Sequence, residues 1–256
     1  VEREAAGVRP GRAGEPRAAG AALGRLGGAP GFRLGDQALA THVERTRRLG
    51  AGETLSAVTA DLSARLGIRH PIVPMSDDAV RTMVLTDQGR LAFQDYFVRR
   101  ACEPRITGVR FEGVEQSRPA PGFEQALSQS DVLVVCPSNP LVSVGPVLAV
   151  PGVADAVASF AGPRIAVSPI VGGQALRGPA AKMMAELGMP STALAVAEHY
   201  GGLLDGFVLD DGDGDLAEAV ERLGMAALVC KTVMESLEDR EELARSVLEF
   251  AGQLAA

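Results

Sequence analysis

The chain has 256 residues, of which 46% are hydrophobic and 22% charged, and its formal net charge is -7. This length suffices for one large α/β domain, with or without a small insertion. The negative charge argues against a nucleic-acid-binding surface, and no apolar run approaches the length that spans a bilayer. The first residues also lack the apolar segment of a signal peptide. We therefore expect a cytoplasmic protein with neither nucleic-acid nor membrane partners.

The first 70 residues divide into a stretch of low order and a helical segment. Residues 1–30 are rich in Ala, Gly, Arg and Pro without a clear period, which predicts a poorly ordered segment. Residues 31–70 are predicted to form a small helical insertion, with helices over 36–49 and 55–66. Apolar residues of the second helix recur at spacings of three and four, and either Thr54 or Ser56 is a suitable N-cap.

Residues 71–256 are predicted to form a Rossmann-like α/β core. Three extended runs come first, over 80–86, 91–98 and 108–112. After residue 120, short apolar strands alternate with helices. The expected strands are 131–136, 164–168, 205–209 and 226–230, and the expected helices are 123–129, 153–160, 179–187, 191–204, 216–223 and 241–254. This alternation predicts a mainly parallel sheet with helices on both faces.

The three cysteines, Cys102, Cys136 and Cys230, are widely spaced and form neither a CxxC pair nor a cluster with histidine. Cys136 and Cys230 each end an apolar run. Because free cysteine is among the most buried residue types, both are predicted to be small buried hydrophobic residues.

Two loops at predicted strand ends carry the residues best suited to a ligand. In open parallel sheets, ligands bind beyond the carboxyl ends of the strands. The first loop offers hydroxyl, amide and glycine groups, and the second offers a glycine pair. These residues are Ser138, Asn139, Ser143 and Gly145, and then Gly172 and Gly173. Asn-Pro and Gly-Gly also occur in ordinary turns, but their shared position favours a site where backbone amides bind a phosphate.

Acidic residues occur in two further loops. Asp211, Asp213 and Asp215 have the spacing that begins a calcium loop, but the required glycine and glutamate are absent, so a solvated turn and helix N-cap is predicted. Asp77 and Asp78 suit a magnesium ion or a polar substrate, and equally an ordinary turn. No histidine has the orienting partner that a general base needs, so none is predicted to be catalytic.

Five ordered segments resemble the 2-phospho-L-lactate transferases, whose actinobacterial members are described as phosphoenolpyruvate transferases. They are FRLGDQALATHVERTRRLGAGETLSAVTADL, PMSDDAVRTMVLTDQGRLAFQDYFV, CPSNPLVSVGPVL, SPIVGGQALRGPAAKMMAELG and KTVMESLEDR. The resemblance covers Gly31 to about Leu254. It implies a guanosine diphosphate ester of 2-phospholactate or enolpyruvate as donor and the deazaflavin Fo as acceptor. A ribityl hydroxyl of Fo would attack the phosphoryl group and release GMP, with Mg²⁺ as cofactor, to form the coenzyme F-420 core.

The resemblance also implies roles for particular residues. The donor nucleotide is expected on Ser138, Asn139, Ser143 and Gly145, with Gly172 and Gly173 nearby. The reacting end of the donor is expected to be faced by Ser76, Asp77, Arg81 and Thr82. Of these, Asp77 and Arg81 are expected to be catalytic. Arg81 could hold a phosphate or carboxylate through two hydrogen bonds. The helical stretch 35–68 resembles part of the family's insertion, which helps cover the Fo pocket. The metal ligands remain unassigned.

The start of the chain departs from the family pattern. Family members open with a strand, a GGxGG-type turn and an acidic segment associated with magnesium and Fo, and residues 1–30 do not resemble these. We therefore expect a fragment or a mis-started reading frame, with a diverged and inactive copy as the alternative. Family members are often dimers, so a homodimer is expected. A competing hypothesis is a non-catalytic regulator of the same fold that binds nucleotide sugars.

Overall fold

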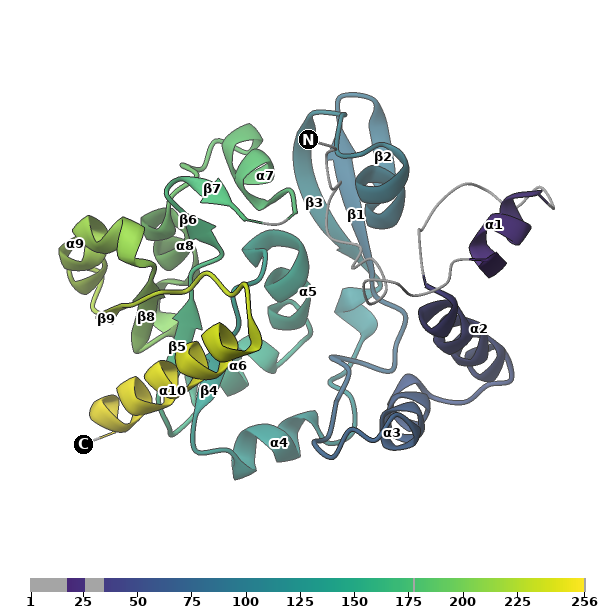
Figure 1. Cartoon of the computed structure of the whole chain (residues 1–256), viewed down its shortest axis with the longest axis horizontal. Helices are drawn as coiled ribbons and strands as arrows, with labels where there is room; N and C mark the ends of the chain where they lie inside the picture. The colour runs from purple at the N-terminus through teal and green to yellow at the C-terminus, as the bar shows by residue number, and fades with distance from the viewer. Residues whose placement is uncertain (1–17, 26–34, 177, 256) are drawn as a thin grey trace.

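The computed structural model describes residues 18–25, 35–176 and 178–255 (Figure 1). Helix α1 (Ala18–Arg25) lies inside the segment for which poor order was predicted. The rest of that segment is outside the described residues. No helix in the described part of the chain has both the length and the apolar character needed to cross a membrane.

A parallel four-stranded sheet forms the larger part of the molecule. Its strands are β4 (Leu133–Val135), β5 (Arg164–Val167), β8 (Gly206–Leu209) and β9 (Ala226–Val229), in the order β4-β5-β8-β9. Each neighbouring pair is parallel. All four predicted strands are therefore confirmed, as is the Rossmann-like α/β fold class.

Helices cover both faces of this sheet because the strands are apolar on both sides. Ile165 and Val167 of β5 pack against Leu243 and Val247 of α10, whereas Ala166 packs on the opposite side with residues of α7 and α8. The helices of this unit are α4 (Phe123–Gln129), α5 (Gly145–Leu148), α6 (Val153–Ala158), α7 (Ala180–Glu186), α8 (Ala193–Tyr200), α9 (Ala217–Glu221) and α10 (Leu237–Leu254). Short 3-10 turns follow at η4 (Gly201–Leu203) and η5 (Asp211–Leu216), and a π-turn, η3 (Pro140–Val144), precedes α5.

A separate antiparallel sheet, in the order β2-β1-β3, packs beside the parallel unit (Figure 1). Its strands are β1 (Arg81–Thr86), β2 (Gly89–Ala92) and β3 (Ile106–Glu112), and the short turn η2 (Val114–Gln116) follows β3. Buried Val84 and Ile106 pack with Met183 of α7, and Leu141 and Val142 of η3 lie against this cluster. The loop that contains η3 therefore touches both sheets.

The predicted strand over 91–98 is wrong in its second half. β2 ends at Ala92, and the π-helix η1 (Asp95–Arg99) follows. Phe93 and Phe97 stack with ring centroids 5.3 Å apart, and Tyr96 between them is fully buried. Aromatic residues favour strands in general, but here tertiary packing of Tyr96 selects the helix.

Helices α2 (Asp36–Gly50) and α3 (Leu55–Arg65) confirm the predicted helical pair. Thr54 caps α3, because its side chain accepts a hydrogen bond from the Ala57 amide. Arg48 joins the two helices by bonding Glu53 and Asp61. The pair lies away from the parallel sheet (Figure 1), and no residue of α2 is buried.

Candidate functional site

The loop after β4 is held in shape by Asn139. Its Oδ1 accepts hydrogen bonds from the Leu141 and Val142 amides at 2.9 and 3.3 Å, and its Nδ2 donates to the sulfur of Met183 at 3.6 Å. Both ends of the Asn139 amide are thus engaged within the protein. These contacts assign Asn139 the task of shaping the loop, and its role as a direct nucleotide contact stays a prediction.

Phe111 of β3 lies between two of the predicted site residues, Gly145 of this loop and Thr82 of β1. A Cβ at Gly145 would lie 3.2 Å from the Phe111 ring and 3.0 Å from the Pro140 carbonyl, so the close approach of two segments favours glycine here. Thr82 lies directly opposite Phe111 in the β1–β3 register, and opposite residues of an antiparallel pair share a face. Thr82 therefore lies on the face of β1 that is turned toward the Gly145 loop, and its role at the reacting end stays a prediction.

Arg81 lies on the opposite face of β1 from Thr82. Successive side chains of a strand point to opposite faces, and Val84, which shares the Thr82 face, packs against the η3 loop. Arg81 is exposed. The two side chains therefore leave β1 from opposite faces, and their shared role at the reacting end stays a prediction.

Ser76, Asp77 and Asp78 tie the segment before β1 to its neighbours. The Ser76 hydroxyl donates to the Arg118 carbonyl at 2.6 Å, and Asp78 accepts from the Arg118 amide at 2.9 Å. Asp77 Oδ1 accepts from the Ser56 amide at the start of α3, at 2.6 Å. One oxygen of each carboxylate is thus committed to the backbone.

Gly172 and Gly173 form the two-residue turn between β6 (Ile170–Val171) and β7 (Gln174–Ala175). Their φ angles are 56° and 76°, the left-handed region that such hairpin turns require and that favours glycine. The Gly172 amide donates to Asp213 Oδ2 at 3.0 Å. Asp213 is buried, so the prediction of a solvated turn is wrong for this residue.

Asp210, which the sequence analysis did not single out, links the ends of β8 and β9. Its carboxylate accepts from the amide and the hydroxyl of Thr232, both at 2.8 Å, and from the Gly212 amide at 3.1 Å. Burial opposes ionisation, but these hydrogen bonds outweigh it and lower the pKa of Asp210. The available signal was its position directly after a buried strand.

The cysteine predictions are partly wrong. Cys136 is exposed and Cys230 is half-buried, whereas Cys102 is buried. Among the described strands β4 has a neighbour on one side only, and Val134 beside the loop is 38% exposed. An apolar run at a sheet edge therefore does not bury the residue that ends it. Burial raises the pKa of the Cys102 thiol.

Apart from Arg81, which points to the other face of β1, the predicted site residues fall into three groups. The first group lies in the β4 loop or faces it and comprises Ser138, Asn139, Ser143, Gly145 and Thr82. Ser143 is the exposed member of this group. Gly172 and Gly173 are tied to the loop after β8. Ser76 and Asp77 are tied to α3 and to the segment before α4. No group of three His, Cys, Asp or Glu side chains suited to a metal ion occurs among the described residues.

The parallel four-stranded sheet with helices on both faces defines a Rossmann-like α/β protein. A family model described as 2-phospho-L-lactate transferase CofD matches residues 23–246. The chain therefore belongs to this family of transferases.

Relatives from bacteria and archaea agree with this assignment. A phosphoenolpyruvate transferase of Streptomyces griseus is 42% identical over 240 residues, which cover 91% of this chain and 76% of the relative. That of Streptomyces avermitilis is 44% identical over 229 residues, covering 87% and 72%. A 2-phospho-L-lactate transferase of Methanosarcina mazei is 37% identical over 224 residues, covering 88% and 73%.

Solved structures show the same fold. A crystal structure of protein BH3568 from Bacillus halodurans matches with a TM-score of 0.57 and 16% identity, covering 80% of this chain and 69% of that one. A second crystal structure of the same protein, described as a member of the upf0052 family, gives a TM-score of 0.54 with the same identity and coverage.

Proposed function

We propose that the protein transfers a three-carbon acid phosphate from a guanosine diphosphate ester to the deazaflavin Fo, releasing GMP, in coenzyme F-420 biosynthesis. The observation that carries this proposal is the match to the transferase family over residues 23–246. In the reaction, the ribityl hydroxyl oxygen of Fo forms a new bond to phosphorus, the bond from that phosphorus to the GMP oxygen breaks with its electron pair staying on GMP, and the hydroxyl proton passes to solvent water. Such chemistry depends mainly on positioning and charge neutralisation.

The β4 loop supports a role in donor binding. Ser143 is exposed and Ser138 is half-buried, while Asn139 and Gly145 fix the backbone between them. The hydroxyls can donate to phosphate or ribose oxygens, and Thr82 adds a third hydroxyl from the facing strand. Gly172 and Gly173 set the neighbouring turn.

Magnesium is part of this proposal. The ion usually takes one or two protein carboxylates together with substrate phosphates and water. Asp77 and Asp78 each keep one carboxylate oxygen outside the hydrogen bonds described above, so they suit such partial coordination. When bound, the ion would neutralise charge on the phosphates. We expect a chelator to abolish turnover and added Mg²⁺ to restore it.

An enolpyruvate-derived donor is favoured over a lactate-derived one. Relatives named phosphoenolpyruvate transferases reach 42% to 44% identity, whereas the Methanosarcina mazei 2-phospho-L-lactate transferase reaches 37%. A comparison of kcat/KM with the two donors, both supplied with Fo and Mg²⁺, tests this preference. A higher value for the lactyl donor would reverse it.

The proposal is tested by following GMP release and the deazaflavin product by chromatography. Ser143→Ala is expected to raise the KM for the donor severalfold, without changing the thermal midpoint. Ser128→Ala removes an exposed hydroxyl of α4 and should change neither. Absence of turnover with both donors, from a folded sample, would contradict the proposed reaction. The expected homodimer is checked by light scattering on the same samples.

A further inference from the structure

The side-chain nitrogen of Asn139 donates to an uncommon acceptor, the thioether sulfur of Met183 in α7, at 3.6 Å. The other end of the Asn139 amide accepts from the Leu141 and Val142 amides. A backbone N–H can only donate, so that end must carry the oxygen and the nitrogen must face the sulfur. Because a thioether is a weak acceptor, the contact depends on how well the sulfur is held in place.

The core holds Met183 in place. Met183 is fully buried in a cluster with Ile106 of β3, and the side chains of Leu141 and Val142 pack against the same cluster. The loop after β4 therefore meets Met183 twice, once through these two apolar side chains and once through the Asn139 amide. The position of the sulfur and the course of the loop are thus set together.

Helix α7 is itself bound to the start of β3. Glu186 Oε2 accepts from the Ile106 amide at 2.8 Å, and Glu186 Oε1 pairs with Lys182 at 2.6 Å. Lys182 also donates to the Pro104 carbonyl at 3.3 Å. Lys182 directly precedes Met183 in the helix, and Glu186 lies less than one turn beyond it. The antiparallel sheet therefore fixes the part of α7 that presents the sulfur to the loop.

We propose that Met183 is a positioning residue for the donor loop. Its sulfur orients the Asn139 amide, the amide oxygen holds the Leu141 and Val142 amides, and the loop so shaped presents Ser143 to the donor. The identity of the donor rests on the proposed function, whereas the contact itself does not. Leucine is similar to methionine in volume and has no acceptor, so Met183→Leu removes the hydrogen bond with little change in packing.

The contact can be observed in the free protein. Asn139 is the only asparagine in the sequence, so labelling with asparagine that carries ¹⁵N in its side-chain amide gives a single pair of proton signals. In the natural chain, we expect slow exchange with water for the hydrogen that faces the sulfur. Met183→Leu should shift this pair and speed its exchange by about threefold to tenfold. Unchanged signals would overturn the proposal.

Met184→Leu is the matched control. Met184 is the next residue of α7 and is also fully buried, but it packs in the cluster on the parallel sheet. Within the part of the chain that the structure describes, no donor bonds its sulfur. The change should therefore leave the Asn139 signals as they are, while it lowers the thermal midpoint about as much as Met183→Leu does. An equal effect of both variants on Asn139 would show that packing, and not the hydrogen bond, orients the amide.

The consequence for the donor is measured by calorimetry with guanosine diphosphate, the part that the two proposed donors share. Met183→Leu should raise the Kd about threefold to tenfold, and Met184→Leu should not change it. Met183→Gln should bring the Kd back toward the natural value, because the glutamine oxygen can accept from Asn139. It should also lower the thermal midpoint, because its own amide nitrogen is buried among apolar side chains. A purely structural residue would lose affinity and stability together. The two leucine variants decide the question even where the glutamine variant does not fold.

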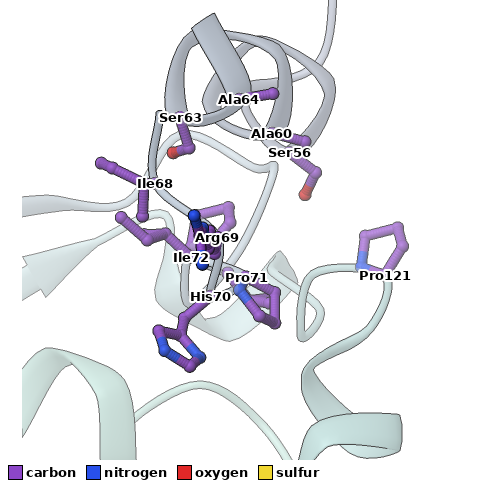
Figure 2. Close-up of a pocket in the computed structure, with 12 residues that line it drawn as sticks. Ser56, Ala60, Ser63, Ala64, Ile68, Arg69, His70, Pro71, Ile72 and Pro121 are labelled. Carbon is purple, nitrogen blue, oxygen red and sulfur yellow. The ribbon is translucent and has the colours of Figure 1, made fainter. Parts of the chain in front are cut away.

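Ile72→Ala tests for effects of packing lost at a distance. Ile72 lines the pocket between α3 and the segment 68–74, and no residue around that pocket belongs to α7 or to the β4 loop (Figure 2). This variant should change neither the Asn139 signals nor the Kd. Faster exchange at Asn139 with an unchanged Kd in Met183→Leu would overturn the proposal, since the loop would then not depend on the amide. Failure of the natural chain to bind guanosine diphosphate would contradict the proposed function, and the amide signals would still decide whether Met183 positions Asn139.

Discussion

Backbone strain is concentrated at two adjacent residues after η1. Ala101 and Cys102 have φ angles of 47° and 59°, values that side-chain-bearing residues rarely adopt. The Cys102 amide donates to the Tyr96 carbonyl at 2.9 Å and its thiol is buried, so packing holds Cys102 in place. Ala101 is exposed, and its methyl group gains no burial in return for the strain.

Replacement of Ala101 by glycine should therefore stabilise the protein. Relief of a left-handed alanine is worth about 1–2 kcal/mol, and the added freedom of the unfolded chain offsets about 0.4–1 kcal/mol. We expect the free energy of unfolding to rise by roughly 0.5–1 kcal/mol, measured by urea denaturation. Ala126→Gly, in exposed helical α4, should lower it by about 1 kcal/mol. Destabilisation by both substitutions would show that Ala101 is not strained.

Asp210 should make stability depend on pH in the acid range. Its pKa is lowered in the folded state, so its contribution is fully present above the unfolded pKa of about 4 and is lost as the pH falls through the folded pKa. Asp210→Asn should cost about 1–3 kcal/mol at pH 7. The difference from the natural protein should stay constant down to about pH 4.5 and narrow below about pH 4. A difference that widens on acidification would contradict this account.

At the scale of elements, β3 presses against the loop after β4. Gly145→Ala would place a methyl group 3.2 Å from the Phe111 ring and 3.0 Å from the Pro140 carbonyl. We expect the free energy of unfolding to fall by about 1–3 kcal/mol and the KM for the donor to rise severalfold. Phe111→Leu makes room for the methyl group, so the double variant should lose less than the sum of the two single changes.

Gly252→Ala is the matched control for this substitution. Gly252 lies within α10, where an added Cβ meets nothing within 4 Å. Alanine there should stabilise the helix by up to about 1 kcal/mol, with no change in kinetics. Simple additivity of Gly145→Ala and Phe111→Leu would mean that the ring does not restrict the loop.

Local patterns in the sequence predicted most elements, and the misses have a common cause. Helix α4 was predicted at its observed bounds, and all four parallel strands were found from their apolar runs. Helix α10 begins four residues before its predicted start, because Ser236 and Asp239 form a capping box outside the apolar stripe. The helical turn at Tyr96 and the buried contact of Asp213 depend on partners distant in the chain. Periodicity carries no information about such partners.

For the candidate site, the sequence indicated the β4 loop as a ligand-binding segment but carried no information on how its residues divide their tasks. Both ends of the Asn139 amide are bound inside the protein, a task in shaping the loop that the motif did not indicate. Arg81 and Thr82 were predicted to act together, although a strand turns them to opposite faces. Motif position indicates which segment matters, whereas the direction of each side chain depends on the fold.

At the scale of the whole molecule, stability should be uneven. Every residue of β8 is buried, whereas α2 has no buried residue and depends on contacts such as those of Arg48. Among the described residues, we expect amide exchange to be fastest in α2 and slowest in β5 and β8. Mass spectrometry of peptic fragments measures this order.

Arg48→Gln should speed exchange in α2 and α3 and leave β8 unchanged. Arg45→Gln, at a partly exposed arginine of α2, is the control and should have little effect. Equal acceleration in β8 would mean that the helical pair and the parallel sheet open as one cooperative unit.

In the loop after β4, the residues that hold its conformation differ from the residue that is exposed to solvent. Leu141 and Val142 anchor it to one core and Val144 to the other, while Asn139 and Gly145 fix its course. The Ser143 amide donates to the Asn139 carbonyl, but Ser143 is exposed and does not belong to either core cluster. A position freed from folding can change without loss of stability. We therefore expect that one or two substitutions at exposed loop positions such as Ser143 can change which donor is preferred, by natural selection or by design, without lowering stability.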